Sequence, residues 1–145
     1  MYLCLMVALM PFVACSSDDG EDPYPIEGTW ISLQSNTDYY EDGEKTSEYN
    51  VTYDENNYYQ IVFRVNGSVT TTEYIDGVAE ETPFEGTYLI EGNTIKIYYT
   101  EDQQNIIDTV SFSINGNTLS ISGEEKEEYE GVLYKEVYTN TYEKQ

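Results

Sequence analysis

The sequence predicts an all-β fold, an antiparallel up-and-down meander of eight or nine strands that closes into a barrel. From Ile26 onward, apolar and polar residues alternate with a period of two, which is typical of strands, and no segment has a helical period. A hairpin motif is also repeated, because residues 88–97 and residues 112–121 match position by position around a turn that contains Gly and Asn. Closure into a barrel removes the exposed edges that so many strands would otherwise leave.

In chain order, the alternation predicts nine strands separated by turns. The strands are expected at residues 28–34, 48–53, 57–65, 68–75, 84–91, 94–100, 107–114, 118–122 and 131–139. Gly and Asn tolerate the positive φ that two-residue hairpin turns require. Such turns are expected at Asn66-Gly67, Asp76-Gly77, Gly92-Asn93 and Gly116-Asn117.

Parity along the strands assigns one face of each strand to the interior. The inward residues carry no charge and are mostly bulky: Ile61, Phe63, Val65, Tyr88, Ile90, Ile95, Ile97, Tyr99, Val110, Phe112, Ile114, Leu119 and Ile121. Their neighbours are polar and suit solvent: Gln60, Arg64, Lys96, Ser111, Ser113 and Ser120. Since bulky side chains can fill a barrel of eight strands, we expect a filled interior or a small pocket.

The charge balance excludes several classes of function. The chain has 145 residues, enough for one domain, with 6 Lys and Arg against 28 Asp and Glu, a net charge of -22 and no histidine. An acidic surface repels phosphate backbones, so we expect no nucleic-acid partner. Without histidine there is no Ser-His or Cys-His catalytic pair and no His-ligated metal. Phosphate-binding and nucleophile motifs are lacking too, and the clustered carboxylates are typical of solvated loops, so we expect no enzymatic activity, no cofactor and no metal site.

The N-terminus predicts an exported, lipid-anchored protein. Residues 1–14 are expected to be a signal peptide, because their apolar run is shorter than the roughly 20 residues needed to span a bilayer. The run ends in Phe12-Val13-Ala14-Cys15, which resembles the lipobox of bacterial lipoproteins. That resemblance implies cleavage before Cys15 and acylation of its thiol, and therefore a membrane-lipid partner, since two or three acyl chains anchor firmly. An ordinary cleaved signal peptide and a buried strand are the alternatives.

An acidic, flexible tether at residues 15–25 is expected to separate the anchor from the domain at residues 26–145. The tether resembles the acidic signal that follows the lipid-bearing cysteine in surface-exposed lipoproteins of Bacteroidetes-type bacteria. The resemblance implies an outer-membrane location with the domain facing the cell exterior. If Cys4 leaves with the signal peptide and Cys15 is acylated, the domain has no thiol and depends on packing alone.

The domain itself resembles the lipocalin-like domains that are common among Bacteroidetes lipoproteins. The resemblance covers about residues 26–140 and rests on Gly28-Thr29-Trp30 together with the repeated hairpin motif. It implies that Trp30 packs across one end of the barrel and that a basic residue near the end of the last strand, here Lys135, lies over it. We expect Trp30 to be a core aromatic rather than a ligand contact.

Three functions stay open on these grounds. The first is binding of a small apolar ligand at the barrel mouth, through Tyr39, Tyr40, Phe63, Tyr88, Tyr99 and Phe112. The second is binding of protein or glycan by a tyrosine-rich segment over the open end of the barrel, through Tyr39, Tyr40, Tyr49, Tyr53, Tyr58 and Tyr59. The third is a filled barrel with a structural role in an envelope assembly. A cavity of about 300 Å³ or more would favour the first.

Overall fold

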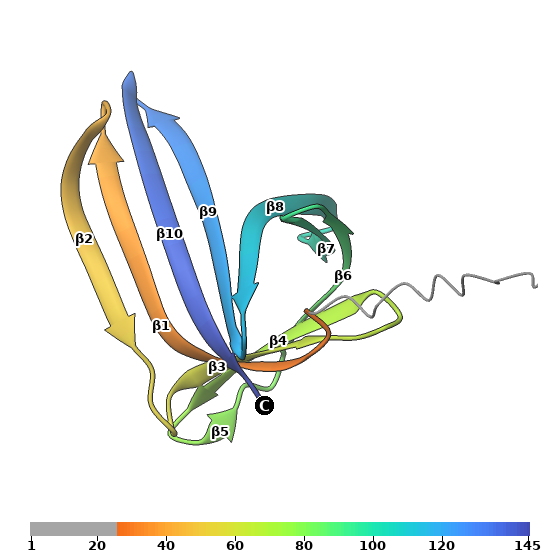
Figure 1. Ribbon diagram of the computed structural model, residues 1–145. Helices are drawn as coiled ribbons and strands as arrows, with labels where there is room; N and C mark the ends of the chain where they lie inside the picture. The colour runs from red at the N-terminus through yellow and green to blue at the C-terminus, as the bar shows by residue number, and fades with distance from the viewer. Residues whose placement is uncertain (1–25) are drawn as a thin grey trace, which may run out of the picture.

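The computed structural model describes residues 26–145, which form an all-β domain (Figure 1). The strands are β1 Gly28–Glu41, β2 Glu44–Thr52, β3 Tyr58–Phe63, β4 Ser68–Ile75, β5 Val78–Ala79, β6 Phe84–Glu91, β7 Thr94–Glu101, β8 Gln104–Asn115, β9 Thr118–Tyr129 and β10 Val132–Lys144. The predicted signal peptide, Cys15 and the tether lie outside the described residues. Within the described residues, no helix has the length and apolar character needed to cross a membrane.

The sheet closes into an antiparallel barrel of eight strands, as predicted. Its order is β10-β9-β8-β7-β6-β4-β3-β1, and β1 pairs with β10 to close it. The closing ladder is long, since it runs from Trp30 opposite Lys144 to Glu41 opposite Tyr134. The two remaining strands lie outside the barrel, where β2 pairs with β1 and β5 pairs with β4.

The barrel forks on two sides. Strand β1 pairs with β3 only over residues 28–31 and then pairs with β2 over residues 34–41. Strand β9 pairs with β8 only up to Ser122, after which it pairs with β10 alone. The outcome is a four-stranded extension, made of residues 44–52, 34–41, 132–140 and 123–129, which rises away from the rest of the barrel (Figure 1).

The hydrophobic core lies in the part of the barrel where all eight strands pair with a neighbour on both sides, which we call the closed end. Trp30 is fully buried, and its indole N–H donates to the carbonyl of Ile26 at 2.6 Å. The core confirms the inward assignment of one group of residues, which are all buried: Ile61, Phe63, Ile95, Val110, Leu119 and Ile121. A second predicted group packs against that core while partly buried: Tyr88, Ile90, Ile97, Phe112 and Ile114. Bulky side chains therefore fill this end, as their size predicted.

Three of the four predicted two-residue turns are confirmed, whereas the turn expected at Asn66-Gly67 is longer and includes Val65. Gly92 and Gly116 have φ of 63° and 59°, and Asp76 and Gly77 have φ of 51° and 76°. Three further turns were not predicted, at Asp42-Gly43, Asp102-Gln103 and Glu130-Gly131.

Several sequence predictions about the strands are wrong, because β1, β9 and β10 run beyond their expected ends at residues 34, 122 and 139, β8 begins before residue 107, and β5 was not expected. Val65 is 83% exposed rather than inward, because β3 ends at Phe63 and Val65 lies in the following turn. The second expected strand, at residues 48–53, begins earlier, at Glu44. Nearly every residue of β2 is exposed, so the strand lacks the apolar alternation that marks a half-buried strand.

Candidate functional site

The candidate site lies at the fork where β1 leaves β3 and joins β2. The register of β1 against β10 is irregular between Ser32 and Gln34, as in a β-bulge. At this point the Ser32 hydroxyl oxygen accepts the backbone N–H of Tyr59 at 2.8 Å, and the Leu33 carbonyl accepts the backbone N–H of Tyr53 at 3.0 Å. A side-chain acceptor thus replaces a ladder hydrogen bond, and the two partner strands of β1 separate.

Two hollows open at this fork. The inner pocket has a volume of about 220 Å³ and is lined by Ser32, Ser35, Tyr53, Tyr59, Thr71, Asn140 and Tyr142. The outer groove has a volume of about 380 Å³ and is lined by Tyr49, Val51, Thr52, Tyr53, Asn57, Tyr58, Tyr59, Glu73, Tyr74 and Ile75. Both hollows contain Tyr53 and Tyr59, and we call the two together the tyrosine cleft.

Strand register explains how the rings of the tyrosine cleft are arranged. Tyr58 lies opposite Tyr74 in the β3–β4 ladder, and their rings stack at 4.5 Å with an interplanar angle of 12°. The next residue, Tyr59, faces the other side of the sheet. Its ring meets that of Tyr53 edge to face, with centroids 5.6 Å apart and an angle of 88°. The two perpendicular rings form a corner shared by the pocket and the groove.

Glu73 supplies the charge in the tyrosine cleft. It lies opposite Tyr59 in the β3–β4 ladder, and the Tyr59 hydroxyl donates to its Oε1 at 2.8 Å. Burial and this carboxylate together raise the pKa of Tyr59 to about 12. Burial also raises the pKa of Tyr142 and that of Tyr53. These three phenols therefore keep their protons at neutral pH, and a protonated phenol can donate a hydrogen bond to a ligand.

The structure does not bring the six predicted ligand residues into one pocket. Phe63 and Tyr88 do lie together, with ring centroids 5.0 Å apart, but Phe63 belongs to the core and the Tyr88 hydroxyl donates to the Arg64 carbonyl at 3.1 Å. Phe112 packs against the same core. Tyr99 lies elsewhere, where its hydroxyl donates to Asp108 at 3.0 Å. Burial and that carboxylate raise the pKa of Tyr99 to about 12.

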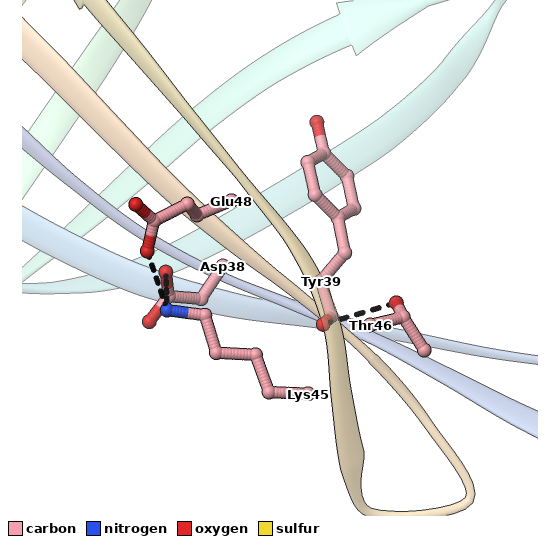
Figure 2. Close-up of polar contacts among 5 residues, drawn as sticks. All are labelled: Asp38, Tyr39, Lys45, Thr46 and Glu48. Atoms are coloured by element: carbon pink, nitrogen blue, oxygen red, sulfur yellow. Dashed lines mark hydrogen bonds and ion pairs between the residues drawn. The ribbon is translucent and has the colours of Figure 1, made fainter.

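Tyr39 and Tyr40 lie in the four-stranded extension and not in a loop. Figure 2 shows the Tyr39 side chain pointing away from the ion pairs of Lys45, whose Nζ lies 2.8 Å from Asp38 and 2.9 Å from Glu48. The Tyr39 carbonyl accepts a hydrogen bond from Thr46 at 3.2 Å. The expected long segment over the barrel mouth is therefore the β1–β2 hairpin, whose strands pair over most of their length.

The basic residue over Trp30 is Lys144 and not Lys135. The Nζ of Lys144 lies 5.2 Å from the centroid of the Trp30 ring, whereas that of Lys135 lies 4.5 Å from the centroid of the Tyr40 ring. The prediction failed because β10 runs on to Lys144, beyond its expected end at residue 139. Lys135 consequently pairs with Tyr40, near the tip of the extension.

Sequence reasoning singled out part of the tyrosine cleft and missed the rest. The tyrosine-rich segment contained Tyr49, Tyr53, Tyr58 and Tyr59, all of which line the cleft. The missed residues from strands distant in sequence are Ser32, Ser35, Thr71, Glu73, Tyr74, Ile75, Asn140 and Tyr142. One signal in the sequence could have indicated a break in the apolar core: the polar residue Ser32 at an inward position, two residues after Trp30.

Chemically, the tyrosine cleft suits binding through rings and hydrogen bonds. Its walls offer aromatic faces, phenol and serine hydroxyls, one side-chain amide in each hollow and a single carboxylate. Among residues 26–145 no group of three or more His, Cys, Asp or Glu side chains is arranged to hold a metal ion.

Comparison with known proteins agrees with the fold. A family model described as a lipocalin-like domain matches residues 26–121, which is more than half of the chain. No curated protein and no solved structure matches this chain. On the family match and the closed antiparallel barrel, the chain belongs to the lipocalin-like domain family.

Proposed function

We propose that the protein is a non-enzymatic lipoprotein of the cell envelope whose lipocalin-like barrel binds a small amphipathic ligand in the tyrosine cleft. One observation carries the binding proposal: a pocket of about 220 Å³ and a groove of about 380 Å³ share Tyr53 and Tyr59. Ligand sites usually measure about 300–1,000 Å³ and place a few polar groups among aromatic walls. The groove has that size, and both hollows place polar groups among tyrosine rings.

The closed end of the barrel favours an amphipathic ligand over the wholly apolar one expected from the sequence. Trp30, Phe63, Ile95 and Leu119 are buried there in one cluster, so the most apolar part of the interior is occupied by the protein's own side chains. The inner pocket lies beside Ser32 and is lined by hydroxyls and an amide. A ligand there is best bound if it offers hydrogen-bonding groups as well as an apolar face, because unpaired polar groups are costly to bury.

The chemistry of the tyrosine cleft supports a binding role without catalysis. The lipocalin-like fold is generally a binding fold. Hydrolysis of glycosides by the common mechanism needs two carboxylates about 5–10 Å apart. Only one carboxylate, that of Glu73, lines the cleft, and it already accepts a hydrogen bond from Tyr59.

The binding proposal is tested by native mass spectrometry of the full chain, released in mild detergent from its own host. We expect a co-purifying small molecule on the wild type. We also expect the Tyr53→Ala variant to lose it, because this change removes one ring of the shared corner. The matched control is Tyr129→Ala, which removes an exposed tyrosine of β9 outside the cleft. Absence of a bound molecule from the wild type, or its retention by Tyr53→Ala, would refute the proposal.

The anchor proposal is supported by the sequence around Cys15, where an apolar run meets a cysteine and an acidic tether follows. We expect Cys15→Ser to move the protein from the membrane fraction to the soluble fraction and to abolish incorporation of labelled fatty acid. The matched control is Cys4→Ser, which leaves the acylated position unchanged. Protease added to intact cells should digest the domain if it faces outward. Retention of the Cys15→Ser protein in membranes would contradict the anchor.

Exposed aromatic and apolar side chains at the outer groove favour a second candidate, recognition of a glycan or protein surface. Tyr49 is 62% exposed and Ile75 is 58% exposed, and both line that groove. Tyrosine is suited to such contacts because it packs through its ring and hydrogen-bonds through its hydroxyl. If this candidate holds, Tyr49→Ala should abolish binding of the full chain to a glycan array or to intact cells, and Tyr53→Ala should weaken it less.

A further inference from the structure

We infer that the tyrosine cleft selects ligands that carry a small organic ammonium group over neutral ligands of the same shape. This inference names the ligand class of the site proposed above, and it rests on that proposed function.

The charge that lines the tyrosine cleft has one sign. Glu73 is the only formally charged residue among those that line the pocket and the groove, and no Lys or Arg lines either. Glu80 lies next to Glu73, since the Oε1 of Glu80 accepts the backbone N–H of Glu73 at 2.9 Å. With a net charge of -22 on the whole chain, the field at the cleft attracts cations and repels anions.

Glu73 keeps one oxygen available for a ligand. Its Oε1 accepts the Tyr59 hydroxyl at 2.8 Å, and this bond holds the carboxylate beside the aromatic corner. Its Oε2 accepts no hydrogen bond from any described residue, and Glu73 forms no ion pair with one. A bound ammonium group would therefore give this carboxylate a counter-ion that the protein itself does not supply.

The rings complete the recognition chemistry. An ammonium group is attracted to the face of an aromatic ring, by about 0.5–1 kcal/mol when exposed and about 2 kcal/mol or more when desolvated. Tyr53 and Tyr59 present two perpendicular rings beside Glu73, whereas the stacked pair of Tyr58 and Tyr74 lies on the other face of β3 and β4. Two tyrosine rings beside one carboxylate suit a methylated ammonium group, which binds through ring faces and charge without needing hydrogen-bond acceptors.

The inner pocket suits the rest of such a ligand. It is lined by Ser32, Asn140 and the hydroxyl-bearing side chains of Tyr142 and Thr71, and it has no charged residue. A short neutral arm that carries a hydroxyl or an amide therefore fits the pocket while the ammonium group lies against the corner. Choline has this design, with a quaternary ammonium group and a hydroxyl on a two-carbon arm, and it is the probe that we choose.

The test is calorimetric titration of the full chain in non-ionic detergent with choline and with its neutral analogue, in which carbon replaces the nitrogen. We expect choline to bind at least about tenfold more tightly, which corresponds to about 1.4 kcal/mol. The Glu73→Gln variant should lose this preference while it still binds the neutral analogue, because only the charge is removed. The matched control is Glu85→Gln, which makes the same change at an exposed position of β6 outside the cleft.

The possible results distinguish a failure of the ammonium inference from a failure of the proposed binding site. Equal affinity for choline and its analogue would overturn the ammonium inference and leave the binding site standing. Loss of the preference in both Glu73→Gln and Glu85→Gln would assign it to net charge and would also overturn the inference. If neither probe binds while a neutral molecule co-purifies from the host, the inference fails and the proposed function stands. If neither probe binds and nothing co-purifies, both fail.

Phosphatidylcholine vesicles as a third titrant identify the source of the ammonium group. Binding to these vesicles alone would assign the ammonium group to a lipid headgroup.

Discussion

Phe63 and Phe112 differ in burial although both were expected to face inward. Phe63 is 2% exposed in the middle of the core, whereas Phe112 packs against the core while partly exposed. Removing a fully buried ring costs its transfer free energy plus the free energy of the cavity left behind, about 3–5 kcal/mol for Phe→Ala. We expect that cost for Phe63→Ala and a clearly smaller one for Phe112→Ala, measured by urea denaturation. Equal costs would show that Phe112 is buried as deeply as Phe63.

Single residues were predictable from the sequence where local parity decides their place. The alternation of polar and apolar residues was sufficient to assign Ile61, Ile95 and Leu119 to the core. It was not sufficient to identify the cation over Trp30, because that contact depends on the pairing of the first strand with the last one. No local pattern carries the register between strands so distant in sequence.

Among the hairpin turns, the β7–β8 turn has the residues that are least suited to positive φ. Asp102 and Gln103 have φ of 48° and 66°, whereas the turns at Asp42-Gly43, Asp76-Gly77 and Glu130-Gly131 place glycine second. The left-handed region costs about 1–2 kcal/mol for a residue with a side chain, partly offset by the larger entropy that glycine loses on folding. We expect Gln103→Gly to raise the free energy of unfolding by about 0.5–1 kcal/mol, measured by chemical denaturation. A loss of stability would contradict this account of the turn.

The free edge of β9 is protected by charge. Beyond Ser122 the strand has no partner on the side away from β10, and its residues 123–129 include four glutamates and one lysine. Unpaired backbone groups invite pairing with another chain, and charged side chains oppose it. We expect replacement of the four glutamates by glutamine to cause concentration-dependent self-association, measured by sedimentation velocity.

The control for the β9 edge removes the same number of charges elsewhere, with glutamine at Glu41, Glu55, Glu81 and Glu85. We expect this variant to stay monodisperse, because none of these residues lies on the unpaired edge of β9. Equal association of the two variants would show that net charge, and not the edge, controls solubility.

Whole elements were predictable where one face is apolar and the other is polar. The hairpins around Gly92 and Gly116 meet that condition, and both were predicted with their turns. The four-stranded extension does not meet it, since β2 and the second half of β9 are exposed on both faces. The alternation of apolar and polar residues therefore could not predict the full length of this extension.

At the scale of the whole molecule, one buried and two half-buried phenols limit stability at high pH. The pKa is raised to about 12 for Tyr59 and Tyr99, and it is raised further for Tyr142, chiefly by burial. In the unfolded chain tyrosine ionises near pH 10. The folded protein holds these protons longer, so the stabilisation is complete below about pH 10 and is lost as the pH rises through about 12.

We accordingly expect the melting temperature to fall steeply between about pH 10 and 12, with tyrosinate absorbance that rises together with unfolding. The Tyr59→Phe variant should show a shallower fall, because it removes one of the phenols involved. A melting temperature that stays constant over this pH range would contradict the burial of these groups.

The closed barrel was predictable from the number of strands, but the position of the candidate site was not. The tyrosine cleft exists because β1 exchanges one partner strand for another at the irregularity near Ser32. That exchange depends on the whole sheet, and its local signs are the density of tyrosine in residues 49–59 and the inward position of Ser32. The remaining lining residues come together only when β3, β4 and β10 are in place.

The pairing of β1 with β10 also fixes the order of events as the chain is made. The ladder between these strands joins Trp30 to Lys144 at one end and Glu41 to Tyr134 at the other, so β1 has no lasting neighbour on that side until β10 has been made. Contacts between residues so far apart slow folding, because the loop between them must first be closed. We accordingly expect the sheet to stay open until β10 pairs with β1, so that this long-range pairing closes the barrel.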